Sequence, residues 1–371
     1  MFFQKKEIRY RVVRLYPDNY LVAPSPTFVL MKKRLSTILQ YVFFISLGLF
    51  FAWLSVKDIN QERWEHIKNS LTQSRKWLFI PVVVTMLIAH WSRAVRWKIL
   101  MEPLGYKPST FNTFSAVLIG YLVNLGVPRL GEVIKCTILA RYEKVRADKL
   151  VGTMVLERTF DVVCLAIVFS LSLILQGNII GGYIKTKLGG FFTDQAGSIS
   201  TEKLLIAGGI FVAGILLVYF LLKKFGHIDA VGKIKNILAN IWHGLVSIRY
   251  VKRKWEFIFH TVLIWTLYLA CTTAGLYALK ETAPMGVEGG LATLSVGSVG
   301  MIATPGGIGA YPLLVSELIG LYGIDSATIG TAMGWLLWTA QTAITLIGGL
   351  FCFAMLSAYN KNRVPQTDTK S

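Results

Sequence analysis

The amino-acid sequence predicts an all-α polytopic membrane protein. Apolar side chains make up 54% of its 371 residues and charged side chains only 16%, whereas soluble domains carry roughly 25% charged residues. The mean hydropathy is +0.54. The net charge of +19, in a chain this apolar, indicates cytoplasmic loops rich in Lys and Arg. We therefore expect the membrane, and no nucleic acid, as the partner of these basic residues.

Six apolar segments are long enough to cross a bilayer, which takes about 20 helical residues. They lie at 38–56, 77–97, 150–176, 204–222, 257–279 and 328–356. Two further apolar stretches, 111–142 and 291–322, are interrupted near the middle by proline and glycine, which end or kink a helix. The pieces on either side are about 11–15 residues long and too short to cross alone. We predict six full spans plus two re-entrant helical hairpins.

The distribution of Lys and Arg predicts the orientation of these eight membrane segments. With a cytosolic N-terminus, 27 Lys and Arg residues fall in inside segments and nine in outside segments, as the positive-inside rule requires. The order span, span, hairpin, span then occurs twice, over 38–176 and 204–356, and the second set begins on the opposite side. This is an inverted-topology repeat, which is typical of transporters. We expect a bacterial inner (cytoplasmic) membrane location with both termini in the cytosol.

The transmembrane domain is expected to cover 31–357. Residues 1–30 contain three prolines and no long apolar run, whereas Met31 is followed by three basic residues and the first apolar segment. We interpret 1–30 as a disordered extension or a misassigned start, and 358–371 as a cytosolic tail.

The sequence contains no recognisable motif for a metal, a cofactor or a catalytic nucleophile. The four cysteines are far apart and lack the Cys/His spacing of a metal site. Neither a nucleophile elbow nor a metalloprotease motif is present. We therefore expect no metal and no cofactor, and no catalytic domain.

Ionisable residues within the predicted membrane segments are the candidates for a functional site, because charge at membrane depth is costly. Glu157 and Asp161 are four residues apart and share a helix face. The functional hypothesis is a polar cavity in which arginines and free helix N–H groups bind the phosphate of a lipid headgroup. Arg129, inside the first break, is the expected primary contact. The candidates gather toward the cytosolic side and are Arg93, Arg96, Asn124, Arg129, Glu132, Glu157, Arg158 and Asp161.

Structural alternatives stay open for these residues. Glu157, Arg158 and Asp161 are equally explained as internal ion pairs that hold spans together. Arg93 and Arg96, near the end of a span, fit side chains that extend to the interface. The glycine-rich second break either brings backbone amides close to a ligand or allows close helix packing; its residues are Pro305, Gly306, Gly307 and Gly309.

At these motifs the sequence resembles the transmembrane region of the lysylphosphatidylglycerol synthases, a family of flippase-like membrane proteins. The resemblance covers roughly 31–357. In two-domain members this region is thought to move aminoacylated phospholipid between leaflets, while a soluble domain performs the aminoacylation. That domain has no counterpart in this sequence, so we expect no lysyl transfer. The motifs are Arg93-x-x-Arg96-Trp97, Asn124-x-x-x-Pro128-Arg129-x-Gly131-Glu132, Glu157-Arg158-x-x-Asp161 and Pro305-Gly-Gly-Ile-Gly309.

The repeat, the clustered charges and the resemblance together favour a lipid flippase or transporter that moves a phospholipid or lipid-linked headgroup between leaflets. Two other functions stay open. One is a membrane-embedded transferase acting on lipid, with Glu132, Glu157 or Asp161 as acid or base. The other is a non-transporting membrane partner of a separately encoded glycosyltransferase or synthase.

Overall fold

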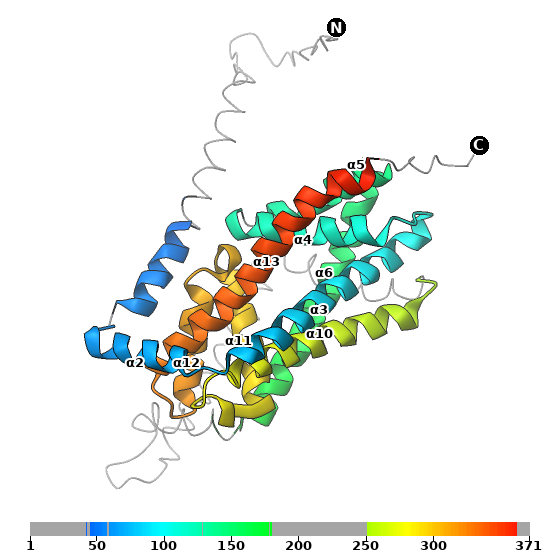
Figure 1. The fold of residues 1–371 in the computed structure, drawn as a ribbon. Coiled ribbons are helices and arrows are strands. Elements are labelled where there is room, and N and C mark those ends of the chain that lie inside the picture. The colour runs from blue at the N-terminus through cyan, green and yellow to red at the C-terminus, as the bar shows by residue number, and fades with distance from the viewer. Residues whose placement is uncertain are drawn as a thin grey trace, which may run out of the picture. The chain divides into compact units, whose positions relative to one another are not determined.

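The computed structural model describes residues 45–57, 59–127, 129–177 and 251–361, together with Val42 and Ile179. All regular structure in these residues is helical (Figure 1), which confirms the predicted all-α class. Five helical segments are long and apolar enough to cross a membrane. The predicted span 204–222, the extension 1–30, Pro128 and most of the C-terminal tail lie outside the described residues.

The described part of the first half contains two long helices, one shorter apolar helix and one interrupted stretch. Predicted spans 77–97 and 150–176 correspond to α3 and α6, and the first broken stretch forms α4 and α5. The span predicted at 38–56 is described as the helix Ile45–Val56. The remaining bounds are α2 Gln61–Thr72, η1 Lys76–Leu78, α3 Phe79–Met101, η2 Glu102–Leu104, α4 Thr110–Gly126, α5 Leu130–Glu143 and α6 Ala147–Leu175.

From α10 onward, the described residues of the second half repeat the order of α3 to α6: a long helix, an interrupted stretch and a long helix. Predicted spans 257–279 and 328–356 correspond to α10 and α13, and the second broken stretch forms α11 and α12. A five-residue π-helical turn, η6, precedes α13. The bounds are α10 Lys254–Leu276, η4 Ala283–Met285, α11 Gly286–Ala303, η5 Pro305–Gly307, α12 Ala310–Leu321, η6 Ser326–Gly330 and α13 Thr331–Asn360.

One helix of the second broken stretch is longer than we expected. With η4, α11 forms a segment of 21 residues, Ala283–Ala303, which is long enough to cross a membrane. The expectation that every piece is too short is therefore wrong for this helix. Near its start this helix packs closely on α10: a Cβ on Gly290 would lie 2.1 Å from Thr273 Oγ1.

The first broken stretch doubles back on itself. The Asn112 side chain, in the first turn of α4, donates to Glu143 Oε1 at the end of α5 over 2.5 Å. The two helices approach most closely at two glycines, since a Cβ on Gly131 would lie 1.8 Å from the carbonyl oxygen of Gly120. Across the break, the backbone N–H of Gly131 donates to Asn124 Oδ1 over 2.8 Å, so Asn124 caps the start of α5.

The second broken stretch also doubles back, and the two breaks touch. Met285 before α11 and Ile319 near the end of α12 share one buried cluster. Between these helices, Gly306, Gly307 and Gly309 all have positive φ angles, which favour glycine. A Cβ on Gly306 would lie 3.2 Å from the Cα of Leu125, near the end of α4. The glycine-rich turn of the second stretch therefore packs against the first break.

Three helix pairs make the largest contacts between the two halves in the described residues. α3 packs along α10, α4 packs on α13, and α11 packs on α6; Figure 1 shows α3 beside α10. Buried apolar residues of α3, α10 and α13 form a shared cluster that contains Val82, Met86, Cys271 and Ile344.

Replacing Gly131 by Ala should destabilise the protein. The added methyl group has no space against the Gly120 carbonyl, and overpacking of this kind costs about 1–3 kcal/mol. Thermal unfolding of the detergent-solubilised protein measures the effect. Gly126→Ala, at the end of α4, is the matched control because a Cβ there meets nothing within 4 Å. Equal melting temperatures for the two variants would contradict the close crossing of α4 and α5.

Candidate functional site

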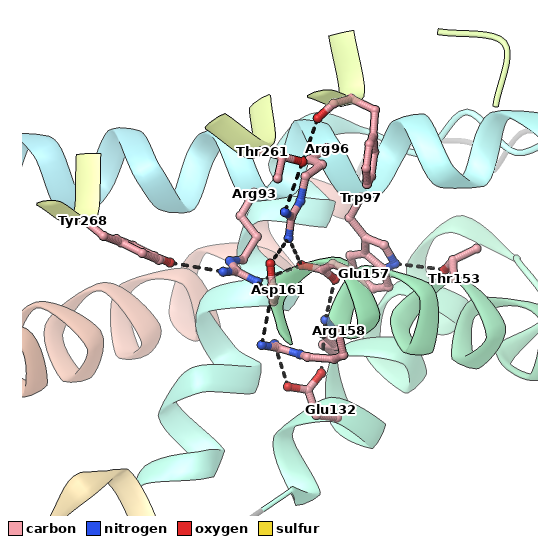
Figure 2. Close-up of polar contacts among 12 residues, drawn as sticks. Arg93, Arg96, Trp97, Glu132, Thr153, Glu157, Arg158, Asp161, Thr261 and Tyr268 are labelled. Carbon is pink, nitrogen blue, oxygen red and sulfur yellow. Dashed lines mark hydrogen bonds and ion pairs between the residues drawn. The ribbon is translucent and has the colours of Figure 1, made fainter. Parts of the chain in front are cut away.

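Seven ionisable side chains from three helices meet in one buried network, most of which Figure 2 shows. Most members recur on their helix at a spacing of three or four residues, which places them on one face, and Arg158 directly follows Glu157 on α6. We call this the ionic network, and its members are Arg93 and Arg96 of α3, Glu132 and Lys135 of α5, and Glu157, Arg158 and Asp161 of α6.

Glu157 lies at the centre of the ionic network and its side chain is 0% exposed. Its Oε1 accepts from Arg93 Nη1 at 3.0 Å and from Arg96 Nη2 at 3.4 Å. Its Oε2 accepts from Lys135 Nζ at 3.0 Å. One carboxylate thus joins α6 to both α3 and α5.

The other two carboxylates extend the network. Asp161 pairs with Arg93 at 2.6 Å, with Arg96 at 2.7 Å and with Arg158 at 3.4 Å. Glu132 pairs with Arg158 at 2.7 Å and with Lys135 at 3.1 Å. Arg158 and Glu132 are the most exposed members, with side chains 35% and 18% exposed. This pair is therefore the most accessible part of the network, and we call it the open edge.

Helix α10 supplies neutral partners to the two arginines of α3. Arg93 Nη2 donates to the hydroxyl of Tyr268 over 3.3 Å. Arg96 Nη1 donates to Thr261 Oγ1 over 3.4 Å. Helix α10 therefore contacts the ionic network without adding charge to it.

Aromatic rings lie against three of the cations of the network. The Lys135 ammonium lies 4.7 Å from the centroid of the Trp97 ring, a favourable cation–π distance. The Trp97 indole is itself held by a hydrogen bond from its Nε1 to Thr153 Oγ1 of 2.9 Å. Phe257 and Tyr121 lie near the guanidinium groups of Arg96 and Arg93.

Comparison with known proteins identifies the family of this chain. The family model described as "Lysylphosphatidylglycerol synthase TM region" matches residues 38–349. The chain belongs to this family. A UPF0104 membrane protein of Methanocaldococcus jannaschii is 25% identical over 134 residues, which cover 35% of this chain and 38% of that relative. The match therefore spans well under half of the relative, and no solved structure matches.

The charges of this lysylphosphatidylglycerol synthase family member do not balance at the site. Four cations face three carboxylates in the ionic network, which leaves one positive charge in excess among the described residues. The Nε groups of Arg93, Arg96 and Arg158 are buried there without an acceptor, and neither ring nitrogen of the adjacent His90 has a partner within the described ranges. The site therefore keeps donor capacity and positive charge.

The structure brings together six of the charged residues that the sequence singled out. The interfacial alternative for Arg93 and Arg96 is wrong, since their side chains are only 5% and 0% exposed and both are paired to carboxylates. Internal ion pairs, the alternative proposed for Glu157, Arg158 and Asp161, are present.

Arg129 and Asn124 lie apart from the ionic network. Arg129 is exposed, has a φ of 65° and precedes the first residue of α5. In the part of the chain that the structure describes, no hydrogen bond or ion pair involves its guanidinium. Asn124 is engaged in capping Gly131, which occupies one of the helix N–H groups that we expected to be open to a ligand.

The second break shows close packing. Pro305, Gly307 and Gly309 are buried, and a Cβ on Gly309 would lie 2.1 Å from the backbone nitrogen of Ala52. The carbonyl of Gly306 accepts from Trp338 Nε1 over 2.8 Å. These contacts favour the packing interpretation, and a ligand at these four residues stays a prediction.

Sequence reasoning missed Lys135 and Tyr268. Lys135 was counted among the cations of a cytosolic segment, although its spacing from Glu132, three residues on one helix, signals an intrahelical pair. Tyr268 had no signal, because a single tyrosine in an apolar span is common. Among the described residues no group of three or more His, Cys, Asp or Glu side chains is placed to hold a metal ion.

Removing the charge of Glu157 should destabilise the protein strongly. Glu157→Gln leaves Arg93, Arg96 and Lys135 short of a buried counter-charge, and breaking a buried ion pair costs about 3–5 kcal/mol. Asp148→Asn is the matched control, because Asp148 pairs with Arg146 in an exposed bridge whose loss should have little effect. Melting temperatures in detergent give the comparison, and an equal decrease in both variants would refute the central role of Glu157.

Proposed function

We propose that this protein is a lipid flippase or transporter that moves a phospholipid or lipid-linked headgroup between the leaflets of a bacterial inner membrane. The observation that carries the proposal is the excess of positive charge in the buried ionic network. Burying an unbalanced charge at membrane depth is costly unless a counter-charge binds there. A phosphate group supplies that counter-charge and accepts paired hydrogen bonds from arginine.

Contacts between distant segments support the proposed topology on its inner side. Asn112 before the first break, Glu143 after it and Asn360 at the end of α13 form one hydrogen-bonded group. Arg253 before α10 pairs with Glu102 after α3 at 2.8 Å. The distribution of Lys and Arg assigns all five residues to the cytosolic side.

A second set of contacts joins segments assigned to the outer side. The backbone N–H of Arg75 donates to the carbonyl of Ala278 over 2.9 Å. Gln176 after α6 donates to the carbonyl of Glu288 over 2.9 Å. Segments assigned to one side therefore contact one another, which supports both re-entrant hairpins.

The helix pairing supports an inverted repeat. In the proposed repeat, α3 corresponds to α10, α4 to α11, and α6 to α13. The contact of α4 with α13 then corresponds to the contact of α11 with α6, and both contacts occur. The same correspondence maps the pair of α3 and α10 onto itself. Each half has three proposed spans, an odd number, so the second half enters the membrane from the opposite side, as in many transporters.

Helix α5 offers a path for the headgroup into the network. Arg129 directly precedes α5, and Glu132 and Lys135 are three residues apart on one side of that helix. Their exposure falls in that order, from an exposed Arg129 to a buried Lys135. In our proposal the phosphate first meets Arg129 and then displaces Glu132 from Arg158 at the open edge.

Arg129→Ala and Arg158→Gln should each slow lipid movement about tenfold or more, because a hydrogen bond to a charged group is worth about 1.5–3 kcal/mol. The measurement is leaflet-resolved labelling of phosphatidylglycerol in vesicles that contain the purified protein. Arg146→Ala is the control, since Arg146 is 70% exposed and pairs with Asp148 outside the network.

Two results would overturn the proposal: lipid movement independent of the protein, or wild-type rates in both arginine variants. If Arg129→Ala instead unfolds the protein while the folded fraction keeps its activity, Arg129 is structural. A modified lipid product formed from a cell lipid extract would favour the transferase. Each carboxylate of the network already accepts from two or three cations, which disfavours it as an acid or base.

Cysteine labelling should establish whether the broken stretches cross the membrane. In a variant lacking the four native cysteines, single cysteines at the exposed positions Lys107 and Arg141 should both react with a membrane-impermeant reagent from the cytosolic side. Cysteines at the exposed positions Glu288 and Asp325 should both react from the outer side. If the members of either pair react from opposite sides, that stretch crosses the membrane and the inverted repeat is wrong.

A further inference from the structure

We infer that an apolar groove between the start of α3 and α10 binds one acyl chain of a phospholipid, with the lipid phosphate at Arg75. The groove has a volume of about 740 Å³, within the range of small-molecule pockets. We call it the α3–α10 groove. Its lining consists of Arg75, Trp77, Leu78, Pro81, Thr266, Leu269, Ala270, Thr273, Ala274, Tyr277 and Val287.

The length of the groove matches one leaflet. Its lining residues on α10 recur every three or four positions from Thr266 to Tyr277, which places them in a single stripe on one helix face. At 1.5 Å per residue this stripe is about 16 Å long. Half of a hydrocarbon core of about 30 Å is about 15 Å, so an extended acyl chain in one leaflet fits along the groove.

The chemistry of the groove identifies a lipid as the occupant. Arg75 is the one charged residue in the lining, and it lies at the end of the stripe, where its backbone N–H donates to the carbonyl of Ala278. Next to it, Trp77 is 65% exposed, as is typical of aromatic anchors at a membrane interface. A cation at the mouth of an apolar groove complements an anionic headgroup above an acyl chain.

An extended peptide segment suits this groove poorly. Its backbone N–H and C=O groups would need partners, and the lining offers few polar side chains, chiefly two threonines and the Arg75 guanidinium. An acyl chain needs none. The occupant that satisfies both the apolar wall and the single cation is therefore a phospholipid.

The groove and the ionic network share helix α10. Leu269, in the groove lining, is adjacent in sequence to Tyr268, whose hydroxyl accepts from Arg93 of the network. Consecutive residues of a helix point about 100° apart, so α10 presents one side to the groove and another to the network. A lipid in the groove thus lies against the helix that contacts the buried arginines.

This inference extends the proposed lipid transport by giving the transported or neighbouring lipid a docking site in the leaflet at Arg75. Its test measures where lipid binds and requires no transport. A negative transport assay would therefore not refute lipid binding in the groove, and a negative crosslinking result would not refute lipid transport.

The experiment uses phosphatidylglycerol that carries a photoreactive diazirine on one acyl chain, reconstituted with the wild-type protein in phosphatidylcholine vesicles. After illumination, mass spectrometry of peptides compares the crosslink yield at Leu269–Ala274 with the yield on α13 at Ile347 and Phe351, which are 68% and 60% exposed. We expect a higher yield in the groove, and we expect excess unlabelled phosphatidylglycerol to decrease it while the α13 yield changes little.

Two variants and one control complete the test. Ala274→Phe fills the groove and Arg75→Gln removes its cation, and each should decrease the groove yield relative to α13 about tenfold. Lys76→Gln removes the adjacent exposed cation, which is not in the lining, and should leave the ratio unchanged.

A groove yield no higher than that of α13 in the wild-type protein would overturn the inference, because it would mean that only bulk lipid touches the groove or that protein covers it. An unchanged ratio in both Ala274→Phe and Arg75→Gln would overturn it as well. Far-ultraviolet circular dichroism of each variant separates loss of binding from loss of folding.

Discussion

The burial of Glu157 between three cations is the interaction on which the rest of the site depends. An ionised carboxylate without solvent is stable only when its partners are close and well oriented. Those partners, Arg93, Arg96 and Lys135, come from two other helices. The position of α6 relative to α3 and α5 is therefore restricted by charge as well as by apolar packing. Three further ion pairs of the network share a cation with this centre, and Arg158 links the remaining carboxylates Asp161 and Glu132.

The hairpin of α4 and α5 makes this arrangement possible. Close approach at Gly120 and Gly131 leaves room for α5 to place Lys135 beside Glu157. The Asn124 side chain satisfies a backbone N–H at the break, which matters because an unpaired N–H costs several kcal/mol in lipid. The hairpin thus brings Lys135 to the buried carboxylates and places an exposed arginine, Arg129, at its turn.

Much of the fold and part of the site could be predicted from sequence, for physical reasons. The length of the apolar segments follows from the thickness of a bilayer, and the proline–glycine breaks mark where a helix is interrupted. Charged residues such as Arg93 and Glu157 are easily recognised within these apolar segments. The pairing of these charges depends on tertiary contacts between helices. The same is true of Asn124, which acts as a cap, and of α11, whose glycine-rich start packs closely against α10.

The central functional claim is that the excess positive charge of the network binds an anionic headgroup. A ligand that binds the folded state raises the melting temperature, because it stabilises that state by RT ln(1 + [L]/Kd). The most direct measurement is the melting temperature of the purified protein in detergent, titrated with the soluble short-chain lipid dihexanoyl phosphatidylglycerol. The account predicts that the melting temperature of the wild-type protein rises with lipid concentration and that this rise is lost in Arg158→Gln. No rise, or an equal rise in both proteins, would contradict it.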